Sequence, residues 1–225
     1  MGVVRDRPAI PPPRRPARAL PRLERAVSLC QDANPPTWFP RVAPALGAAY
    51  TLGGRAADAM PLLTQAMEQT IATEMVAYEA LCRLSLEEAL ALAGRLKEAH
   101  ALAERALALA QEHQEQGHQA YALRLLGEIT ARRAPPEAEQ AEAHYRQGLT
   151  LADDLGMRSL MVHCHLGLGI LYHQIGRHEE AQASLFTAVK LYHAMDMTFW
   201  IPQAEAALGY GGVGPRYAWS RPRNS

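Results

Sequence analysis

The sequence lacks the features that would place the chain in a membrane or on a secretory route. No apolar run approaches the roughly 18 residues of a membrane-spanning helix, and the Arg- and Pro-rich N-terminus has no apolar stretch of the signal-peptide type. The cysteines are Cys30, Cys82 and Cys164, far apart and without a C-x-x-C pair. This spacing argues against a disulfide framework or a zinc knuckle. We therefore expect a cytoplasmic protein without a membrane partner.

The chain also has no excess of positive or negative charge, and it has few aromatic residues. Lysine plus arginine equals aspartate plus glutamate at 23 each, and aromatic residues make up only 6% of the chain. Such a chain offers nucleic acid neither an attractive field nor many stacking surfaces, so no nucleic-acid partner is expected. There is no G-x-x-x-x-G-K-[ST] phosphate loop, and no cofactor is expected. Alanine and leucine dominate instead, which favours an all-α protein.

One eight-residue pattern occurs twice in full. The first copy is Leu46, Gly47, Tyr50, Gly54, Arg55, Ala59, Leu63 and Ala66, and the second, 122 residues later, is Leu168, Gly169, Tyr172, Gly176, Arg177, Ala181, Leu185 and Ala188. Two weaker copies lie between them. In the first of these, Glu87 replaces the glycine after the leucine and Ala103 replaces the later leucine. A period of about 40 residues indicates a repeat architecture.

Each unit predicts two antiparallel helices, because apolar and small residues recur at spacings of three and four on both sides of a Gly-Arg turn. Gly54, Gly94 and Gly176 suit helix C-termini, where the left-handed conformation costs glycine little. In the third unit Pro135 and Pro136 make the break instead. The small residues Gly47, Gly169, Ala59 and Ala181 would allow the two helices of a unit to approach closely.

The repeat register predicts a helical array between two disordered ends. The boundaries are a leader at 1–18, a half unit at 19–36, full units at 37–73, 74–116, 117–156 and 157–197, a half unit at 198–209 and a tail at 210–225. The arginines and prolines of the leader could instead form a docking tail for nucleic acid or an SH3-type domain. The composition of the leader is more typical of disorder.

The repeated pattern resembles the tetratricopeptide repeat, because Leu-Gly is followed by Tyr and then by Ala, a large apolar residue and Ala. The resemblance covers roughly residues 19–209. It implies an α-solenoid of antiparallel helix pairs, wound into a right-handed superhelix. It also implies a non-catalytic scaffold that binds a peptide or a partner domain in a concave groove. Because the array is cut within a unit at both ends, self-association through the open ends is a further expectation.

Three segments carry a narrower resemblance. Residues 125–157, 162–181 and 191–208 are similar to the C-terminal arm of large bacterial signalling proteins, in which the arm follows a nucleotide-cyclase and an ATPase domain. This resemblance implies an alternative function, in which the chain is the detached arm of such a protein and its partner is a cyclase or ATPase module. Any cyclase or ATPase activity would then belong to domains that this sequence does not contain.

The tetratricopeptide resemblance implies that fixed positions of each first helix line the groove. The candidate groove residues are Tyr121, Arg124, Glu128 and Arg132 in the third unit and His163, His173 and Gln174 in the fourth. The corresponding positions of the first two units are mainly apolar and include Leu52, Leu81, Leu84, Glu88 and Leu92. A second interpretation is that Arg124, Glu128 and Arg132 form i,i+4 ion pairs on a solvated helix face.

Histidines cluster between residues 161 and 181, which suggests a metal site. His163 and His165 are two residues apart and therefore point to opposite sides of a helix, whereas chelation on a helix needs ligands three or four residues apart. Cys164 is expected to be a small packed thiol. We therefore predict no metal site and no catalytic site. The alternative from another class is a helical metal-dependent hydrolase that uses this cluster.

Overall fold

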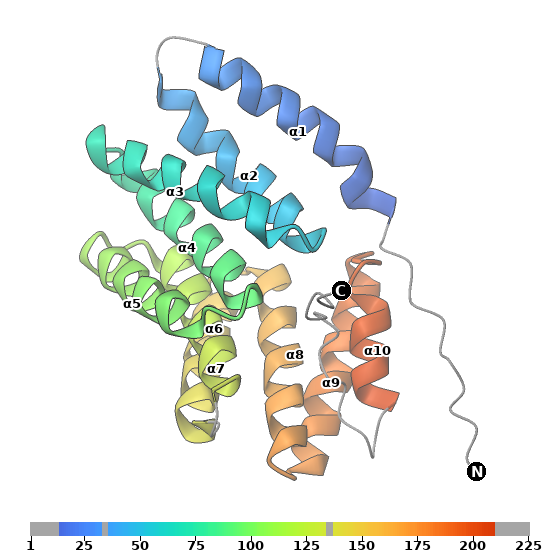
Figure 1. The fold of residues 1–225 in the computed structure, drawn as a ribbon. Coiled ribbons are helices and arrows are strands. Elements are labelled where there is room, and N and C mark those ends of the chain that lie inside the picture. Colours follow the sequence, from blue (N-terminus) through green and yellow to red (C-terminus); the bar gives the residue numbers. More distant parts are fainter. Residues whose placement is uncertain (1–13, 33–35, 134–136, 210–225) are drawn as a thin grey trace, which may run out of the picture.

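The computed structural model describes residues 14–32, 36–133 and 137–209, and within them every regular element is helical (Figure 1). The helices are α1 (Arg14–Asp32), the 3₁₀ helix η1 (Pro36–Trp38), α2 (Phe39–Leu52), α3 (Ala56–Ala72), α4 (Val76–Leu92), α5 (Leu96–Glu112), α6 (Gln116–Ala131), α7 (Ala138–Asp154), α8 (Arg158–Gln174), α9 (His178–Ala194) and α10 (Ile201–Gly209). The prediction of an all-α protein is confirmed.

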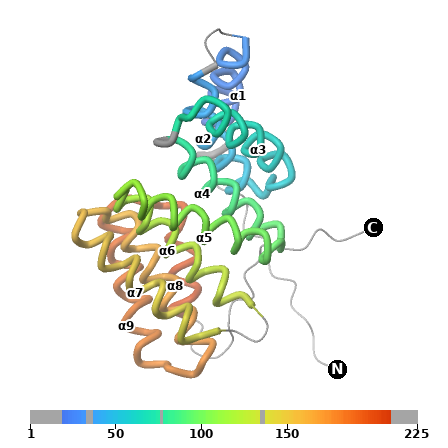
Figure 2. Tube along the Cα trace, turned by 90° about the vertical axis from the view of Figure 1, so that its left-hand side faces the viewer, coloured from blue at the N-terminus to red at the C-terminus, as the bar shows by residue number. Residues whose placement is uncertain are grey.

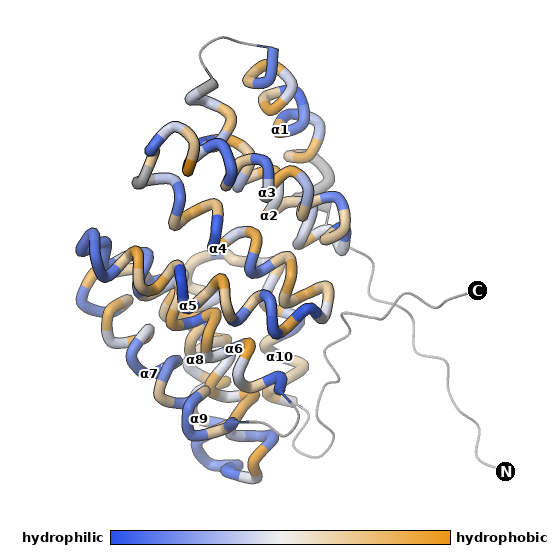
Figure 3. Tube along the Cα trace, turned by 60° about the vertical axis from the view of Figure 1, so that its left-hand side comes forward, coloured by the Kyte–Doolittle hydropathy of each residue, from blue (hydrophilic) through white to orange (hydrophobic). Residues whose placement is uncertain are grey.

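Helices that follow one another in sequence pack against one another. From α1 to α10 each helix contacts the next, and Figure 2 shows α1 to α4 above α5 to α9. The even-numbered helices α2, α4, α6 and α8 also contact one another in that order. These helices therefore form one layer, and α3, α5, α7 and α9 cover it from the other side. Hydrophobic and hydrophilic stretches alternate along the helices, as amphipathic helices require (Figure 3).

The Gly-Arg turns end helices as predicted. Gly54, Gly94 and Gly176 have φ angles of +76°, +80° and +80°, the left-handed conformation that glycine adopts with little strain. The amide of Arg55 donates to the carbonyl of Tyr50 at 2.8 Å, and Arg177 donates to Tyr172 at the same distance. These bonds satisfy carbonyl groups at the helix end, so each turn closes its helix and reverses the chain.

Close helix approach within a unit depends on small residues. A Cβ atom added to Gly47 would lie 2.6 Å from Cδ2 of Leu63, and one added to Gly169 would lie 2.5 Å from Cγ of Leu185. In these two units the glycine of the first helix therefore makes room for the leucine of the second. These are the Gly and Leu positions of the repeated pattern, and the contact explains why both recur together.

The structure differs from the sequence-based prediction at the N-terminal end. Helix α1 begins at Arg14, inside the leader that was predicted to be disordered as far as residue 18. The rest of the leader (residues 1–13), the predicted tail (210–225) and the predicted break at Pro135 and Pro136 lie outside the described residues. Among the helices described, none is both long and apolar enough to cross a lipid bilayer.

Candidate functional site

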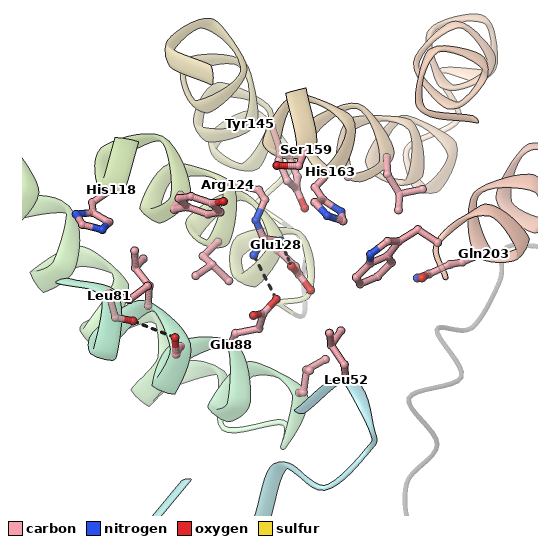
Figure 4. A pocket seen from close by; sticks show the side chains of 18 residues that line it. Leu52, Leu81, Glu88, His118, Arg124, Glu128, Tyr145, Ser159, His163 and Gln203 are labelled. Carbon is pink, nitrogen blue, oxygen red and sulfur yellow. Dashed lines mark hydrogen bonds and ion pairs between the residues drawn. The ribbon is translucent and has the colours of Figure 1, made fainter. Parts of the chain in front are cut away.

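A hollow of about 450 Å³ opens between the even-numbered helices. Its lining comes from α2, α4, α6 and α8, with Tyr145 from α7, Trp200 from the segment before α10 and Gln203 from α10 (Figure 4). Apolar walls are supplied by leucines of four helices, and the polar groups gather where α4 faces α6. One layer of helices thus presents a single concave surface built from every second helix.

Four of the seven predicted groove residues line this hollow. They are Tyr121, Arg124, Glu128 and His163. Arg132 lies beside it, and its guanidinium donates to Glu128 at 2.5 Å and to the carbonyl of Ala91 at 3.4 Å.

The remaining two predicted residues lie elsewhere. His173 is half-buried near the C-terminal end of α8, and its ring packs edge-on against that of His178 with 5.5 Å between the centroids. Gln174, the last residue of α8, is exposed. Both lie beyond the part of α8 that lines the hollow, which runs from Ser159 to Gly167.

A charged cluster occupies the meeting point of α4 and α6. The guanidinium of Arg124 donates to Glu128 at 2.9 Å on its own helix and lies 3.5 Å from Glu88 on α4 (Figure 4). The side chain of Arg124 is only 13% exposed. The i,i+4 ion pairs that the sequence suggests are therefore present, but the side chain of Arg124 is largely buried between α4 and α6 and does not lie on a solvated face.

The pKa shifts in this cluster follow from burial and charge. Desolvation lowers the pKa of Arg124, but the carboxylates of Glu128 and Glu88 outweigh it, and the pKa is raised. Desolvation opposes the charge of Glu128, yet Arg132 and Arg124 hold its pKa below the ordinary value. Glu88 differs, because desolvation raises its pKa in spite of Arg124. Of the two carboxylates in this cluster, Glu88 is thus the one whose charge is less well compensated by neighbouring cations.

His163 belongs to an aromatic cluster at the other side of the hollow. Its Nδ1 shares a hydrogen bond of 2.9 Å with the hydroxyl of Tyr192, and its ring packs edge-on against Trp200 with 4.8 Å between the centroids. Burial and the positive charge of Arg124 lower the pKa of His163 to about 3. The imidazole is therefore neutral and a weak base near neutral pH.

The other members of the histidine cluster do not meet at one point. Cys164 is fully buried, and burial raises the pKa of its thiol to about 11. His165 is half-buried, and desolvation lowers its pKa. In the described part of the chain, no three His, Cys, Asp or Glu side chains gather in a way that could hold a metal ion.

Several lining residues were missed by sequence reasoning, and Tyr145 and Trp200 are the largest of them. Tyr145 occupies the large apolar position of the second helix in its unit, where a core role is expected, but its ring extends between Gly127 and Gly167 to the hollow. Trp200 lies just after the fourth unit, where residues 198–209 repeat the aromatic pair and proline of residues 37–47. That repetition was the available signal for Trp200, and the sequence holds no comparable signal for Tyr145.

Comparison with known proteins gives a likeness of fold. No protein-family model and no curated protein matches the chain. A solved structure, the crystal structure of BtubC (BKLC) from P. vanneervenii, matches with a TM-score of 0.65 over 86% of this chain and 82% of that chain. The sequence identity is 18%. At this identity the likeness shows that the two chains share a helical fold, and it says nothing of what this chain binds.

Proposed function

We propose that the chain is a tetratricopeptide-like α-solenoid that acts as a non-catalytic interaction arm. In this proposal a peptide or partner segment binds in the hollow between α2, α4, α6 and α8. The observation that carries the proposal is that every second helix contributes to one concave lining. Repeat proteins use such surfaces to hold extended partners, because the stacked helices keep the contact residues in fixed places.

The repeat and the packing support the solenoid. The same glycine, leucine and turn positions recur in the first and fourth units, and each makes the same contact in both. Helices contact their neighbours in chain order and every second helix contacts the next in its layer. A chain of equivalent helix pairs stacked in this way builds a continuous core between units, as solenoids do.

The chemistry of the hollow favours binding over catalysis. Of its two histidines, His163 is a weak base with a pKa of about 3 and shares a hydrogen bond with Tyr192, and His118 is paired with Glu115. Arg124 and Glu128 are bound to each other. A general base needs a pKa nearer the operating pH, whereas apolar walls with a few oriented polar groups are typical of ligand sites.

The proposal can be tested by affinity capture followed by mass spectrometry. We compare the wild-type chain with Tyr121→Glu, because Tyr121 lines the hollow and is 39% exposed, so the fold tolerates a change there. Arg105→Glu is the matched control, since Arg105 is exposed on α5 in the other layer. We expect the Tyr121 variant to lose partners that the wild type and the control retain. Identical partner sets for all three chains, each shown to be folded by circular dichroism, would overturn the proposal.

A further inference from the structure

The hollow is apolar on most sides. Leucines of α2, α4, α6 and α8 form its walls: Leu52, Leu81, Leu84, Leu92, Leu125 and Leu166. Two large aromatic side chains, Tyr121 and Trp200, face the same space, and Tyr121 is 39% exposed. We therefore expect a ligand of this hollow to have large apolar or aromatic side chains, because these would remove the apolar walls from contact with water.

The cations at the hollow already have anionic partners. Arg124 contacts both Glu128 and Glu88. Arg132 binds Glu128 and the carbonyl of Ala91. An incoming carboxylate would have to displace one of these contacts from a largely buried guanidinium, and a buried charge that loses its partner is costly. The hollow is therefore poorly suited to an acidic segment.

The carboxylate of Glu88, unlike these guanidinium groups, is accessible to a ligand. Among the residues that the structure describes, its sole ion pair is the contact to Arg124 at 3.5 Å, and 38% of its side chain is exposed. Two carboxylates line the hollow, Glu88 and Glu128, and His163 is neutral. The guanidinium groups of Arg124 and Arg132 both bind Glu128 at shorter distances than the 3.5 Å between Arg124 and Glu88, so Glu88 has the weaker cationic contact. His118, also in the lining, is paired with Glu115 at 2.9 Å. A cation that enters from solvent would find a carboxylate with room to accept it.

We propose that the hollow selects a peptide segment in which a lysine or arginine lies next to large aromatic or aliphatic side chains. The cation binds the carboxylate of Glu88, and the apolar side chains bind between the leucine walls, Tyr121 and Trp200. The inference rests on the proposed function, and it adds the chemical class of the ligand.

Fluorescence anisotropy with three labelled peptides tests the selection on the full chain. The probes are GSRWYRSG, its acidic counterpart GSEWYESG, and GSRAARSG, which keeps the charge and lacks the aromatic rings. Glu88→Gln removes the charge with little change in shape. Glu179→Gln is the matched control, since Glu179 is exposed on α9 away from the hollow. Circular dichroism checks the fold of both variants.

We expect the cationic aromatic probe to bind the wild type at least about tenfold more tightly than the acidic probe, because only the cationic probe can form a charge-assisted hydrogen bond with Glu88. We also expect it to bind about tenfold more tightly than GSRAARSG, because that probe has no large side chain to cover the apolar walls of the hollow. Glu88→Gln should weaken this probe by about tenfold or more on the same grounds, and Glu179→Gln should leave it unchanged.

Other outcomes separate the two proposals. Tighter binding of the acidic probe, lost on Tyr121→Glu, would overturn the cation selectivity and leave groove binding intact. Equal weakening by Glu88→Gln and Glu179→Gln would also overturn it. If none of the probes binds while Tyr121→Glu still loses captured partners, the ligand class is wrong and the groove stands. If none binds and the captured partners are unchanged, both proposals fail.

Discussion

Glu87 is an ionisable residue in an otherwise apolar part of the core. It is fully buried on α4, and within the described part of the chain neither carboxyl oxygen has a hydrogen-bond partner. Burial raises its pKa to about 8, although Arg83 and Arg124 act in the opposite direction. The repeat has glycine at this position in the other full units. A buried carboxyl group without partners is stable only while it is protonated.

Glu87 therefore makes stability depend on pH in a defined direction. Its folded pKa of about 8 lies above the ordinary value of 4.5, so the folded state holds a proton that the unfolded state releases between these values. Its contribution is fully present below the unfolded pKa and is lost as pH rises through about 8, with a slope of about 1.4 kcal/mol per pH unit. We expect Glu87→Gln to remove this slope.

Urea unfolding at pH 5 and pH 7.5 measures the effect. The informative quantity is the difference between wild type and Glu87→Gln, because other titrating groups are common to both. Glu179→Gln, an exposed substitution, serves as the control and should follow the wild type. If Glu87→Gln loses as much stability between the two pH values as the wild type does, Glu87 is not protonated in the folded state.

At the scale of the helix pair, a small residue on one helix is matched by a large one on the next. Gly47 faces Leu63, Gly169 faces Leu185, and a Cβ atom on Gly127 would lie 2.8 Å from Cγ of Tyr145. The second unit has the sizes in reverse, with Glu87 on α4 and the fully buried Ala103 on α5 at the corresponding positions. The second unit thus has a large side chain on the first helix and a small one on the second, which keeps a large residue paired with a small one. Close-packed interiors tolerate such exchanges of volume between neighbouring positions.

A double-mutant cycle on Gly169 and Leu185 tests this matching. Gly169→Ala should lower the free energy of unfolding by about 1–3 kcal/mol through overpacking, and Leu185→Ala by about 2–5 kcal/mol through the cavity it leaves. Because the shorter side chain relieves the clash, the double variant should lose less than the sum by about 0.5–3 kcal/mol.

Gly209→Ala combined with Leu185→Ala is the matched control cycle for denaturant unfolding. Among the residues that the structure describes, none has an atom close enough to touch a methyl group added at Gly209, so its effect should add to that of Leu185→Ala. Additivity in both cycles would mean that the contact between Gly169 and Leu185 does not determine the packing of α8 on α9.

For the whole molecule, stability is expected to vary with position in the stack. Helix α6 packs on four helices, α4, α5, α7 and α8, whereas α1 packs on α2 and η1, and α10 on α9. In proteins built from contacts between neighbours, the ends lose structure at a lower free energy than the middle.

Hydrogen–deuterium exchange followed by mass spectrometry checks this expectation. Peptides from α1 and α10 should exchange faster than peptides from α6, and a low concentration of urea should widen the difference. Uniform exchange in all three helices would indicate that the molecule unfolds as one cooperative unit instead.

Local sequence patterns were sufficient to predict much of the fold and part of the candidate site. The spacing of apolar residues and the turn glycines at Gly54, Gly94 and Gly176 predict helices and their ends, because both depend on near neighbours in the chain. The helix register likewise places Tyr121 and Arg124 on one face of α6. The register does not show where along a helix the groove lining ends. His173 was therefore predicted to line the groove, whereas the lining from α8 ends at Gly167.

By itself, the sequence determined the all-α class, the helix pairs and the faces that each helix turns to its neighbours, since these follow from periodicity and turn chemistry. Only the tertiary structure decided which side chains meet across helices. It brought Glu88 to Arg124, placed Trp200 against His163, and carried Tyr145 past Gly167 into the hollow. These contacts join residues of different units, and they depend on the angles between stacked helices, which no local pattern encodes.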